Sequence, residues 1–122
     1  MRHDQKLDPI LNSGEYVFCH PLEGKIEAVE IIGFFKESEG ITFIIGKDIA
    51  DRLGLRYDDV WAWITLNSHT SLTEVGITAR FSTALASEGI SCNVIAAIHH
   101  DHIFVRTTDA HKAIGILSRL KM

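Results

Sequence analysis

Apolar and polar residues alternate most regularly in the second half of the chain, over Val60 to Leu66. Two sets of side chains alternate there: Trp61, Trp63 and Thr65 on one side, and Ala62, Ile64 and Leu66 on the other. This period of two predicts a buried strand. The two tryptophans share one side of a central strand, so we interpret them as core or interface packing rather than as a ligand platform.

A helix is predicted after the polar loop that begins at Asn67. Ser71 and Glu74 have the spacing of a capping box, which predicts a helix from Thr73 to Glu88, about four turns long. Gly89 stands where a left-handed residue would end it. The apolar stripe of this helix has a spacing of three and four residues: Ile77, Phe81, Ala84 and Leu85.

The remainder of this half predicts a hairpin and a last helix. Ile90 to Ile98 has the composition of a strand, His99 to Asp101 that of a turn, and His102 to Arg106 that of a returning strand. Asp109 is expected to cap the last helix. Its apolar face is Ala110, Ala113, Ile114 and Leu117. The order β-α-β-β-α predicts a ferredoxin-like α+β fold, βαββαβ, whose final strand is supplied elsewhere.

The first half predicts a reduced copy of the second. Its expected elements are strands at Glu15 to His20, Val29 to Phe35 and Ile41 to Ile45, a turn at Leu22 to Gly24, and a short helix from Asp48 to Leu53 that Gly54 ends. Phe43 and Asp48 precede Phe104 and Asp109 by the same interval, 104 − 43 = 109 − 48 = 61 positions. This match indicates a duplicated strand-and-helix unit, in which the first copy has lost or shortened a helix.

The composition is that of a folded protein. Hydrophobic residues make up 46% of the 122 positions and charged residues 23%, and no apolar stretch approaches the ~20 residues of a membrane span. The net charge of −4, without a basic cluster, argues against a nucleic-acid partner. Cys19 and Cys92 have no CxxC partner, so we expect buried thiols in a reduced, cytoplasmic protein, with a disulfide or a reactive thiol as the alternative.

The chain lacks the common catalytic motifs, and no catalytic residue or cofactor is predicted. Histidines 99, 100 and 102 and Asp101 are residue types that bind zinc. Neighbours on a hairpin alternate faces, so only His100 and His102 could converge, and a metal would need a further ligand such as His69. We favour a structural turn without metal.

Several segments, which together cover most of the chain, carry a family resemblance: Gly14–Cys19, Glu39–Thr42, Trp63–Leu66, His69–Leu72, Val75–Thr78, Ala86, Gly89–Ile95 and His100–Val105. In these segments the chain resembles a family of small bacterial tandem ACT-like proteins of unassigned function. The resemblance implies two ACT-like units, residues 1–59 and residues 60–122.

The resemblance also implies a regulatory module that binds an amino acid or a similar small molecule. ACT domains commonly bind such ligands through the loop after the first strand and the start of the first helix. Their usual signature there is Asp-x-Pro-Gly with a Leu two residues later, and this chain keeps only the glycine, Gly76. The ligand residues implied are Asn67, Ser68, His69, Ser71, Thr73, Val75, Gly76, Ile77 and Thr78.

Two alternatives to this site remain open. The same polar loop is also explained by ordinary helix capping, since Ser71 and Glu74 would satisfy the free amides internally. The chain could likewise be an interaction protein that associates through ACT-like sheets without any ligand. With or without a ligand we expect a homodimer, because short sheets with apolar strands leave exposed edges, and pairing protects such edges.

Overall fold

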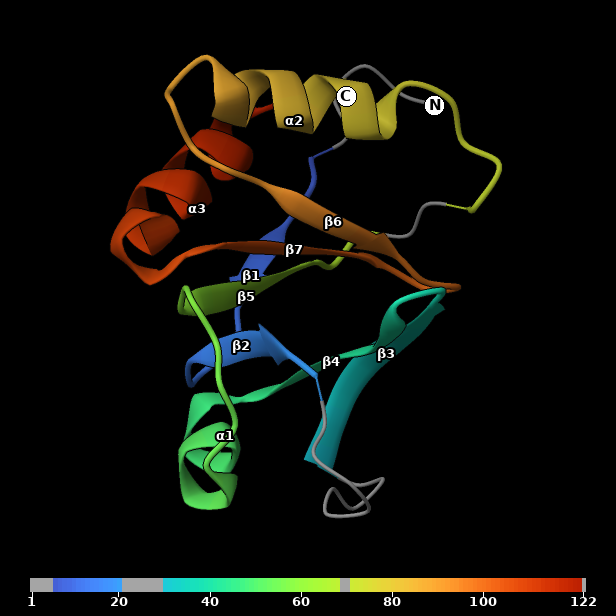
Figure 1. Ribbon diagram of the computed structural model, residues 1–122. Helices are drawn as coiled ribbons and strands as arrows, with labels where there is room; N and C mark the ends of the chain where they lie inside the picture. Colours follow the sequence, from blue (N-terminus) through green and yellow to red (C-terminus); the bar gives the residue numbers. More distant parts are fainter. Residues whose placement is uncertain (1–5, 21–29, 69–70, 122) are drawn as a thin grey trace. The chain divides into compact units, whose positions relative to one another are not determined.

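The computed structural model describes residues 6–20, 30–68 and 71–121 (Figure 1). The chain divides into two compact units. The C-terminal unit consists of residues 1–13 and 62–122, and the N-terminal unit of residues 14–61. The division into ACT-like halves at residues 59 and 60 stays a prediction. No helix in the described ranges is both long and apolar enough to cross a membrane.

The C-terminal unit has a ferredoxin-like arrangement. Its elements are β1 (Pro9–Leu11), β5 (Trp61–Leu66), α2 (Ile77–Ala86), β6 (Asn93–Ala96), β7 (Asp101–Arg106), the 3-10 helix η2 (Thr107–Asp109) and α3 (Ala110–Arg119). Its strands lie in the order β1-β5-β7-β6, so α2 connects two strands that β7 separates. The remaining strand, whose source the sequence left open, is β1, which pairs antiparallel with β5.

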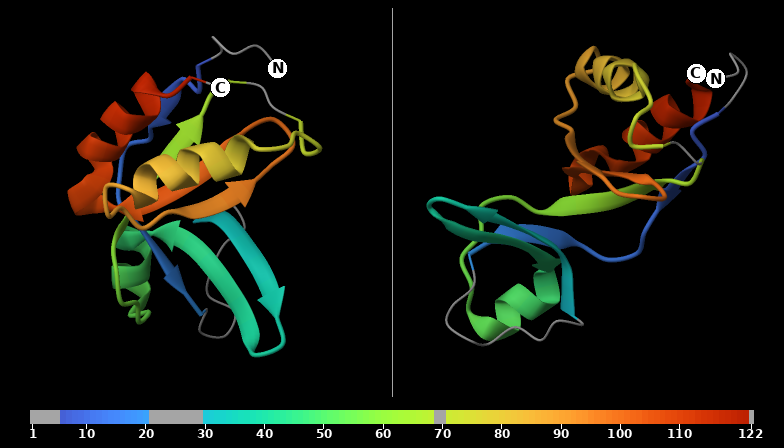
Figure 2. Two further views of the ribbon diagram at one scale, coloured as in Figure 1. Left: turned by 90° about the horizontal axis from the view of Figure 1, so that it is seen from above. Right: turned by 90° about the vertical axis from the view of Figure 1, so that its right-hand side faces the viewer.

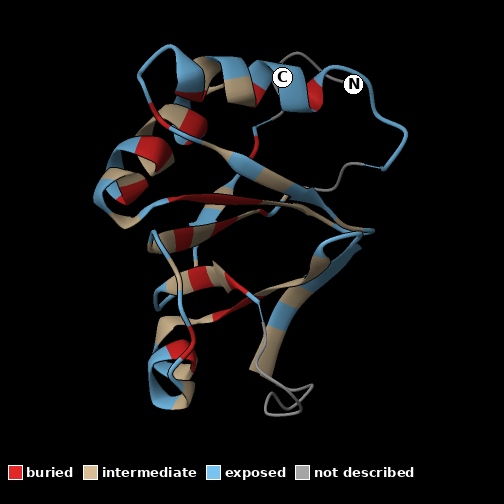
Figure 3. Ribbon diagram, viewed as in Figure 1, coloured by how far each residue is buried: buried red, intermediate tan, exposed pale blue. Residues whose placement is uncertain are grey.

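The core of the C-terminal unit lies between this sheet and its two helices, which cover the same face (Figure 2). Burial alternates along β5, as its sequence period predicts (Figure 3). The core cluster joins β5 and β7 to both helices and includes Ala62, Ile64, Leu66, Ile77, Phe81, Leu85, Ile103, Val105, Ala110, Ala113 and Leu117. Residues spaced by three and four positions on α2 and α3 therefore supply the layer that packs on the sheet.

The end of α2 confirms the role predicted for Gly89. This residue has φ +75°, and its N–H donates to the Ala86 carbonyl at 2.9 Å. The next N–H, of Ile90, donates to the Leu85 carbonyl at 3.0 Å, which completes a Schellman motif. Both Ile90 and Leu85 are buried, so the motif also fixes where the chain leaves the helix.

The N-terminal unit repeats part of the C-terminal unit. Its described elements are β2 (Tyr16–Cys19), β3 (Ile31–Glu37), β4 (Gly40–Gly46) and α1 (Lys47–Leu53), and its strands lie in the order β3-β4-β2. The corresponding strands of the C-terminal unit lie in the order β6-β7-β5, so the duplicated strand-and-helix pairs are β4-α1 and β7-α3. Gly54 ends α1 with φ +70°, as predicted. The predicted turn at Leu22 to Gly24 lies outside the described residues.

One predicted strand boundary and one predicted capping hydrogen bond are wrong. The strand expected over Ile90 to Ile98 is shorter, because Ile90 belongs to the Schellman motif and Ala97 N–H already bonds the His100 carbonyl at 3.1 Å in the turn. Asp109 holds the N-cap position of α3, but its side chain makes no capping hydrogen bond. Its φ and ψ, −102° and 0°, belong to the preceding 3-10 turn rather than to the extended backbone of a usual cap.

Candidate ligand site

The helix α2 begins one turn later than its sequence predicts. Gly76 holds its N-cap position with φ +92°, and helical geometry starts at Ile77. Because a left-handed residue interrupts the helix, the predicted start at Thr73 is wrong. Arg80 N–H closes the first turn on the Gly76 carbonyl at 3.1 Å. The N–H groups before Arg80 in this turn have no partner within the helix.

The predicted capping box does not form. Glu74 N–H donates to the Ser71 carbonyl at 3.1 Å, and the Ser71 and Thr73 hydroxyl groups lie 2.9 Å apart. These polar residues therefore close a separate turn before the helix, and α2 has no side-chain capping hydrogen bond. Local spacing suggested the box, but Gly76 separates its residues from the helix.

The chain near the N-terminus holds the beginning of the loop. The Asn67 N–H donates to the Asp8 carbonyl at 2.9 Å, and the Ser68 N–H donates to the Leu7 carbonyl at 3.2 Å. Asp8 has φ +52°, which is uncommon for a residue other than glycine. The backbone amides of Asn67 and Ser68 are thus already used inside the C-terminal unit.

The other expected ligand residues differ in how far their side chains are exposed. Ser71, Thr73, Val75, Gly76 and Thr78 are exposed around the start of α2. The Ile77 side chain is buried in the core, so only its backbone could meet a ligand at this surface. His69 lies outside the described residues. Whether these residues bind a ligand stays a prediction.

The histidine segment is divided by the hairpin. His102, on β7, lies beside Trp63 and Thr65 on β5: its Nδ1 is 3.0 Å from Trp63 Nε1 and 3.1 Å from Thr65 Oγ1. The indole N–H can only donate, so Nδ1 accepts. Trp63 also stacks on Phe104 at 6.2 Å, which agrees with its interpretation as a packing residue.

No cluster of three or more potential metal ligands forms among the residues that the structure describes. The rings of His99 and His100 are neighbours in the turn, with centroids 6.4 Å apart and planes inclined at 52°. His102 is engaged with β5, so the segment is not arranged as a single set of ligands. The absence of a structural metal stays a prediction, because His69 is outside the described ranges.

Both cysteines are free. Cys19 is buried and Cys92 is half-buried. Burial raises the pKa of both thiols, that of Cys92 to about 11. A raised pKa keeps the thiol protonated at neutral pH and makes it a poor nucleophile.

Family models for the ACT domain match residues 5–62 and residues 56–119 of this chain. The chain belongs to the ACT-domain family. Together the two matches span both units of the structure, which confirms the tandem arrangement inferred from the duplicated strand-and-helix pair.

Solved structures of other proteins share the tandem ACT fold. A protein of unknown function from Vibrio cholerae is 40% identical, with a TM-score of 0.87 over 98% of this chain and 92% of its own. An Agrobacterium tumefaciens protein is 19% identical, with a TM-score of 0.73 over 93% of this chain and 87% of its own. A Porphyromonas gingivalis protein described as a C-terminal regulatory domain of aspartate kinase is 15% identical. Its TM-score is 0.61 over 93% of this chain and 96% of its own. No curated protein matches the chain.

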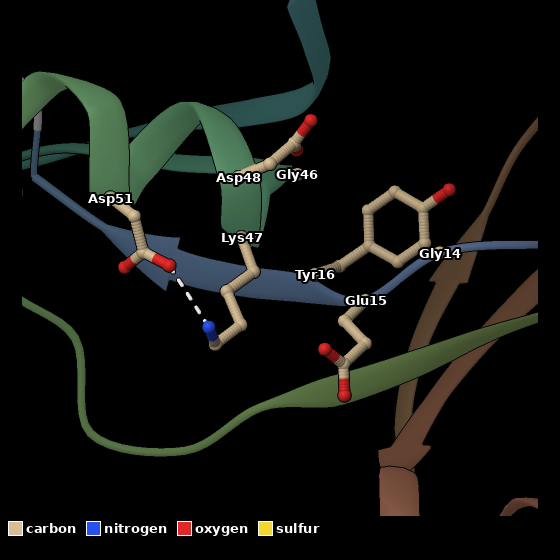
Figure 4. Close-up of a pocket in the computed structure, with 7 residues that line it drawn as sticks. All are labelled: Gly14, Glu15, Tyr16, Gly46, Lys47, Asp48 and Asp51. Carbon is tan, nitrogen blue, oxygen red and sulfur yellow. Dashed lines mark hydrogen bonds and ion pairs between the residues drawn. The ribbon is translucent and has the colours of Figure 1, made fainter.

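The N-terminal ACT-like unit contains a pocket that the sequence did not suggest. It has a volume of about 460 Å³ and lies between the start of β2 and the start of α1 (Figure 4). Its lining residues are Gly14, Glu15, Tyr16, Gly46, Lys47, Asp48 and Asp51. Lys47 Nζ bonds Asp51 Oδ2 at 2.9 Å, which leaves the carboxylates of Glu15 and Asp48 uncompensated within this lining. Burial, and then the charge of Asp48, raise the pKa of Tyr16. The pocket is therefore unsuited to the carboxylate of a ligand.

A second pocket in the same unit has mixed charge. It measures about 410 Å³ and is lined by Phe18, Cys19, His20, Thr42, Arg56, Tyr57 and Asp58. Arg56 and Asp58 bring opposite charges to one lining. In the sequence these residues form the segment Arg56-Tyr57-Asp58 shortly after Gly54, which is indistinguishable from an ordinary solvated turn.

Proposed function

We propose that this chain is a non-enzymatic regulatory module that binds an amino acid or a similar small molecule at the start of α2. The observation that supports this function is membership of the ACT-domain family, whose members typically bind amino acids in regulatory roles. Both cysteines are free, which agrees with the cytoplasmic location expected from the sequence.

The start of α2 offers the chemistry that a ligand carboxylate needs. The first-turn N–H groups and the positive end of the helix dipole attract an anion, and α2 is ten residues long. Gly76 has no side chain, and a β-carbon built there meets nothing within 4 Å, so the surface is open on that side. The exposed hydroxyl of Thr78 would donate or accept one further hydrogen bond. The pocket beside α1 carries three carboxylates against one ammonium group and would repel the same ligand.

A thermal-shift survey with the twenty amino acids tests this function. A ligand at 100 times its dissociation constant adds about 2.7 kcal/mol to the stability of the folded protein. The site is then tested with Gly76→Ala and a matched control, Gly89→Ala. Both glycines have positive φ, +92° and +75°, and neither has an atom within 4 Å of an added β-carbon. Each variant should therefore lose a similar stability, about 1–2 kcal/mol.

Only the Gly76 variant should lose the ligand-induced shift, because only its methyl group would stand beside the first-turn amides. A shift that survives in Gly76→Ala and equals that of Gly89→Ala would place the ligand elsewhere. Valine is unsuited to this test, since a β-branched residue is strongly strained at a positive φ.

The second candidate function is an interaction protein that associates through its sheets without a ligand. The exposed aromatic side chains on β3, Phe34 and Phe35, favour it, because exposed apolar strands at a sheet edge typically mark association surfaces. No thermal shift with any amino acid, together with stable self-association, would support this function over the first. We propose a homodimer under both.

A further inference from the structure

The strand β3 is an exposed sheet edge with aromatic side chains. Among the described residues it pairs only with β4. Its side chains Ile32, Phe34 and Phe35 are 41%, 58% and 72% exposed, and no residue of β3 is buried (Figure 3). Neighbouring residues alternate between the faces of a sheet, so Phe34 and Phe35 expose aromatic surface on both faces. Native proteins rarely leave such an edge uncovered.

The corresponding edge of the C-terminal unit differs. There β6 takes the place of β3 and pairs with β7. Its residues Asn93, Val94, Ile95 and Ala96 include no aromatic side chain, and Ile95 is 38% exposed. The same position in the same topology thus carries an aromatic pair in only one of the two units. This difference distinguishes β3 from the matching edge of the C-terminal unit.

We propose that β3 pairs antiparallel with β3 of a second copy of this chain, about a two-fold axis through Phe35. The β3–β4 register shifts between Ile31 and Gly33, so the regular part of the strand is Gly33 to Glu37. Phe35 is the midpoint of this segment, so a two-fold axis at Phe35 gives every residue of the segment a partner in the second copy. An isologous pair of this kind closes on itself and leaves a two-fold dimer.

The charges of the strand favour this register. Lys36 lies opposite Phe34 of the second copy, which allows two symmetric contacts between an ammonium group and an aromatic ring. Glu37 lies opposite Gly33 of the second copy, and Phe35 faces its own counterpart. An axis through Lys36 would instead place two ammonium groups opposite each other, which is destabilising. An axis through Phe34 would require Ile32 to pair with Lys36 of the second copy, and the β3–β4 register is irregular at Ile32.

The exposed area sets the expected strength of the dimer. An aromatic side chain offers about 150–250 Å², so Phe34 and Phe35 leave roughly 200–300 Å² uncovered in each chain. Two copies would bury roughly 400–600 Å² of aromatic surface, against about 1,200–2,000 Å² in a stable complex. The strand pair therefore supplies about a third of a standard interface, and the dimer should dissociate reversibly on dilution.

Disulfide trapping in the full chain tests the register. Opposite residues of an antiparallel pair have Cα atoms about 4.5–5.5 Å apart, within the range of a disulfide. Phe35→Cys should therefore form a covalent dimer in oxidised glutathione. Phe34→Cys should not, because it faces Lys36 of the second copy, and neither should Ile95→Cys on β6. The unmodified chain gives the background level of cross-linking. This level should be low, because Cys19 is buried and the pKa of Cys92 is raised. Cross-linking of Phe34→Cys as fast as Phe35→Cys would overturn the register.

Sedimentation equilibrium over a range of concentrations tests the surface without a disulfide. Phe35→Glu should raise the dimer dissociation constant about tenfold or more, because two carboxylates would meet at the axis. Ile95→Glu is the matched control and should change it less than about twofold. The proposal rests on the homodimer proposed above: a monomeric wild-type chain refutes both. A wild-type dimer that Phe35→Glu leaves unchanged refutes only this surface, and neither result bears on the ligand site.

Discussion

Lowering the pH should weaken the C-terminal unit through His102. Its Nδ1 accepts hydrogen bonds from Trp63 Nε1 at 3.0 Å and from Thr65 Oγ1 at 3.1 Å. Asn12 Nδ2 donates to the same Thr65 oxygen at 2.9 Å, so the hydroxyl proton is directed to the histidine. Both bonds require Nδ1 without a proton. A proton there would set two N–H groups against each other and remove the acceptor for Thr65.

The sign of the effect follows from the pKa of His102, which lies below its ordinary value of 6.5. Burial is the main cause, the charge of His100 adds to it, and Asp101 opposes it. The unfolded chain therefore binds this proton more readily than the folded chain. The stability contribution is complete above about pH 6.5 and is lost as the pH falls below that value and through the lower pKa of the folded protein.

The magnitude comes from the two hydrogen bonds. A neutral bond contributes about 0.5–1.5 kcal/mol, and the half-exposed position of His102 favours the lower end, so the loss should be about 1–2 kcal/mol. Urea unfolding at pH 8 and pH 5 measures it, with His102→Leu as the comparison. The wild-type chain should lose about 1–2 kcal/mol more than the variant between these values. Equal losses in both proteins would refute this role for His102.

Three further predictions concern other parts of the chain. Cys92 should react slowly with a thiol reagent at pH 8, because its pKa is raised to about 11, and rapid reaction would contradict this. Phe81→Ala should lower the free energy of unfolding by about 3–5 kcal/mol, since the ring is 0% exposed in the core; a loss below about 1 kcal/mol in urea unfolding would contradict that burial. Elemental analysis should find no stoichiometric zinc, and one zinc per chain that disappears when His100 and His102 are both changed to Ala would show the metal prediction to be wrong.

The elements with strong periodicity were predicted from the sequence alone. Along β5 the period of two matches the alternation of burial, and on α2 the stripe from Ile77 to Leu85 forms the buried face. The ends at Gly54 and Gly89 were also predicted correctly, because a left-handed residue after a helix is a local requirement that glycine meets best. These features depend on residues within a few positions of each other.

The features that were missed depend on distant contacts or on backbone conformation. The strand β1 is three residues long and contains Pro9, so it has no period of its own and exists because β5 pairs with it. The start of α2 was misplaced, since the Ser71 and Glu74 spacing is visible in the sequence while the φ of Gly76 is not. Pockets in the N-terminal unit combine residues from a strand and a later helix or turn, and no single segment indicates them.

Binding of an amino acid at the start of α2 is tested most directly by the backbone amide shifts of the ¹⁵N-labelled chain during titration. The ligand used would be the amino acid that gives the largest thermal shift. We expect the largest changes at Gly76, Ile77 and Thr78, with saturation at a single affinity, because a bound carboxylate would accept hydrogen bonds from these amides. Changes centred instead on Arg56 and Asp58, with those of Gly76 to Thr78 unmoved, would contradict it.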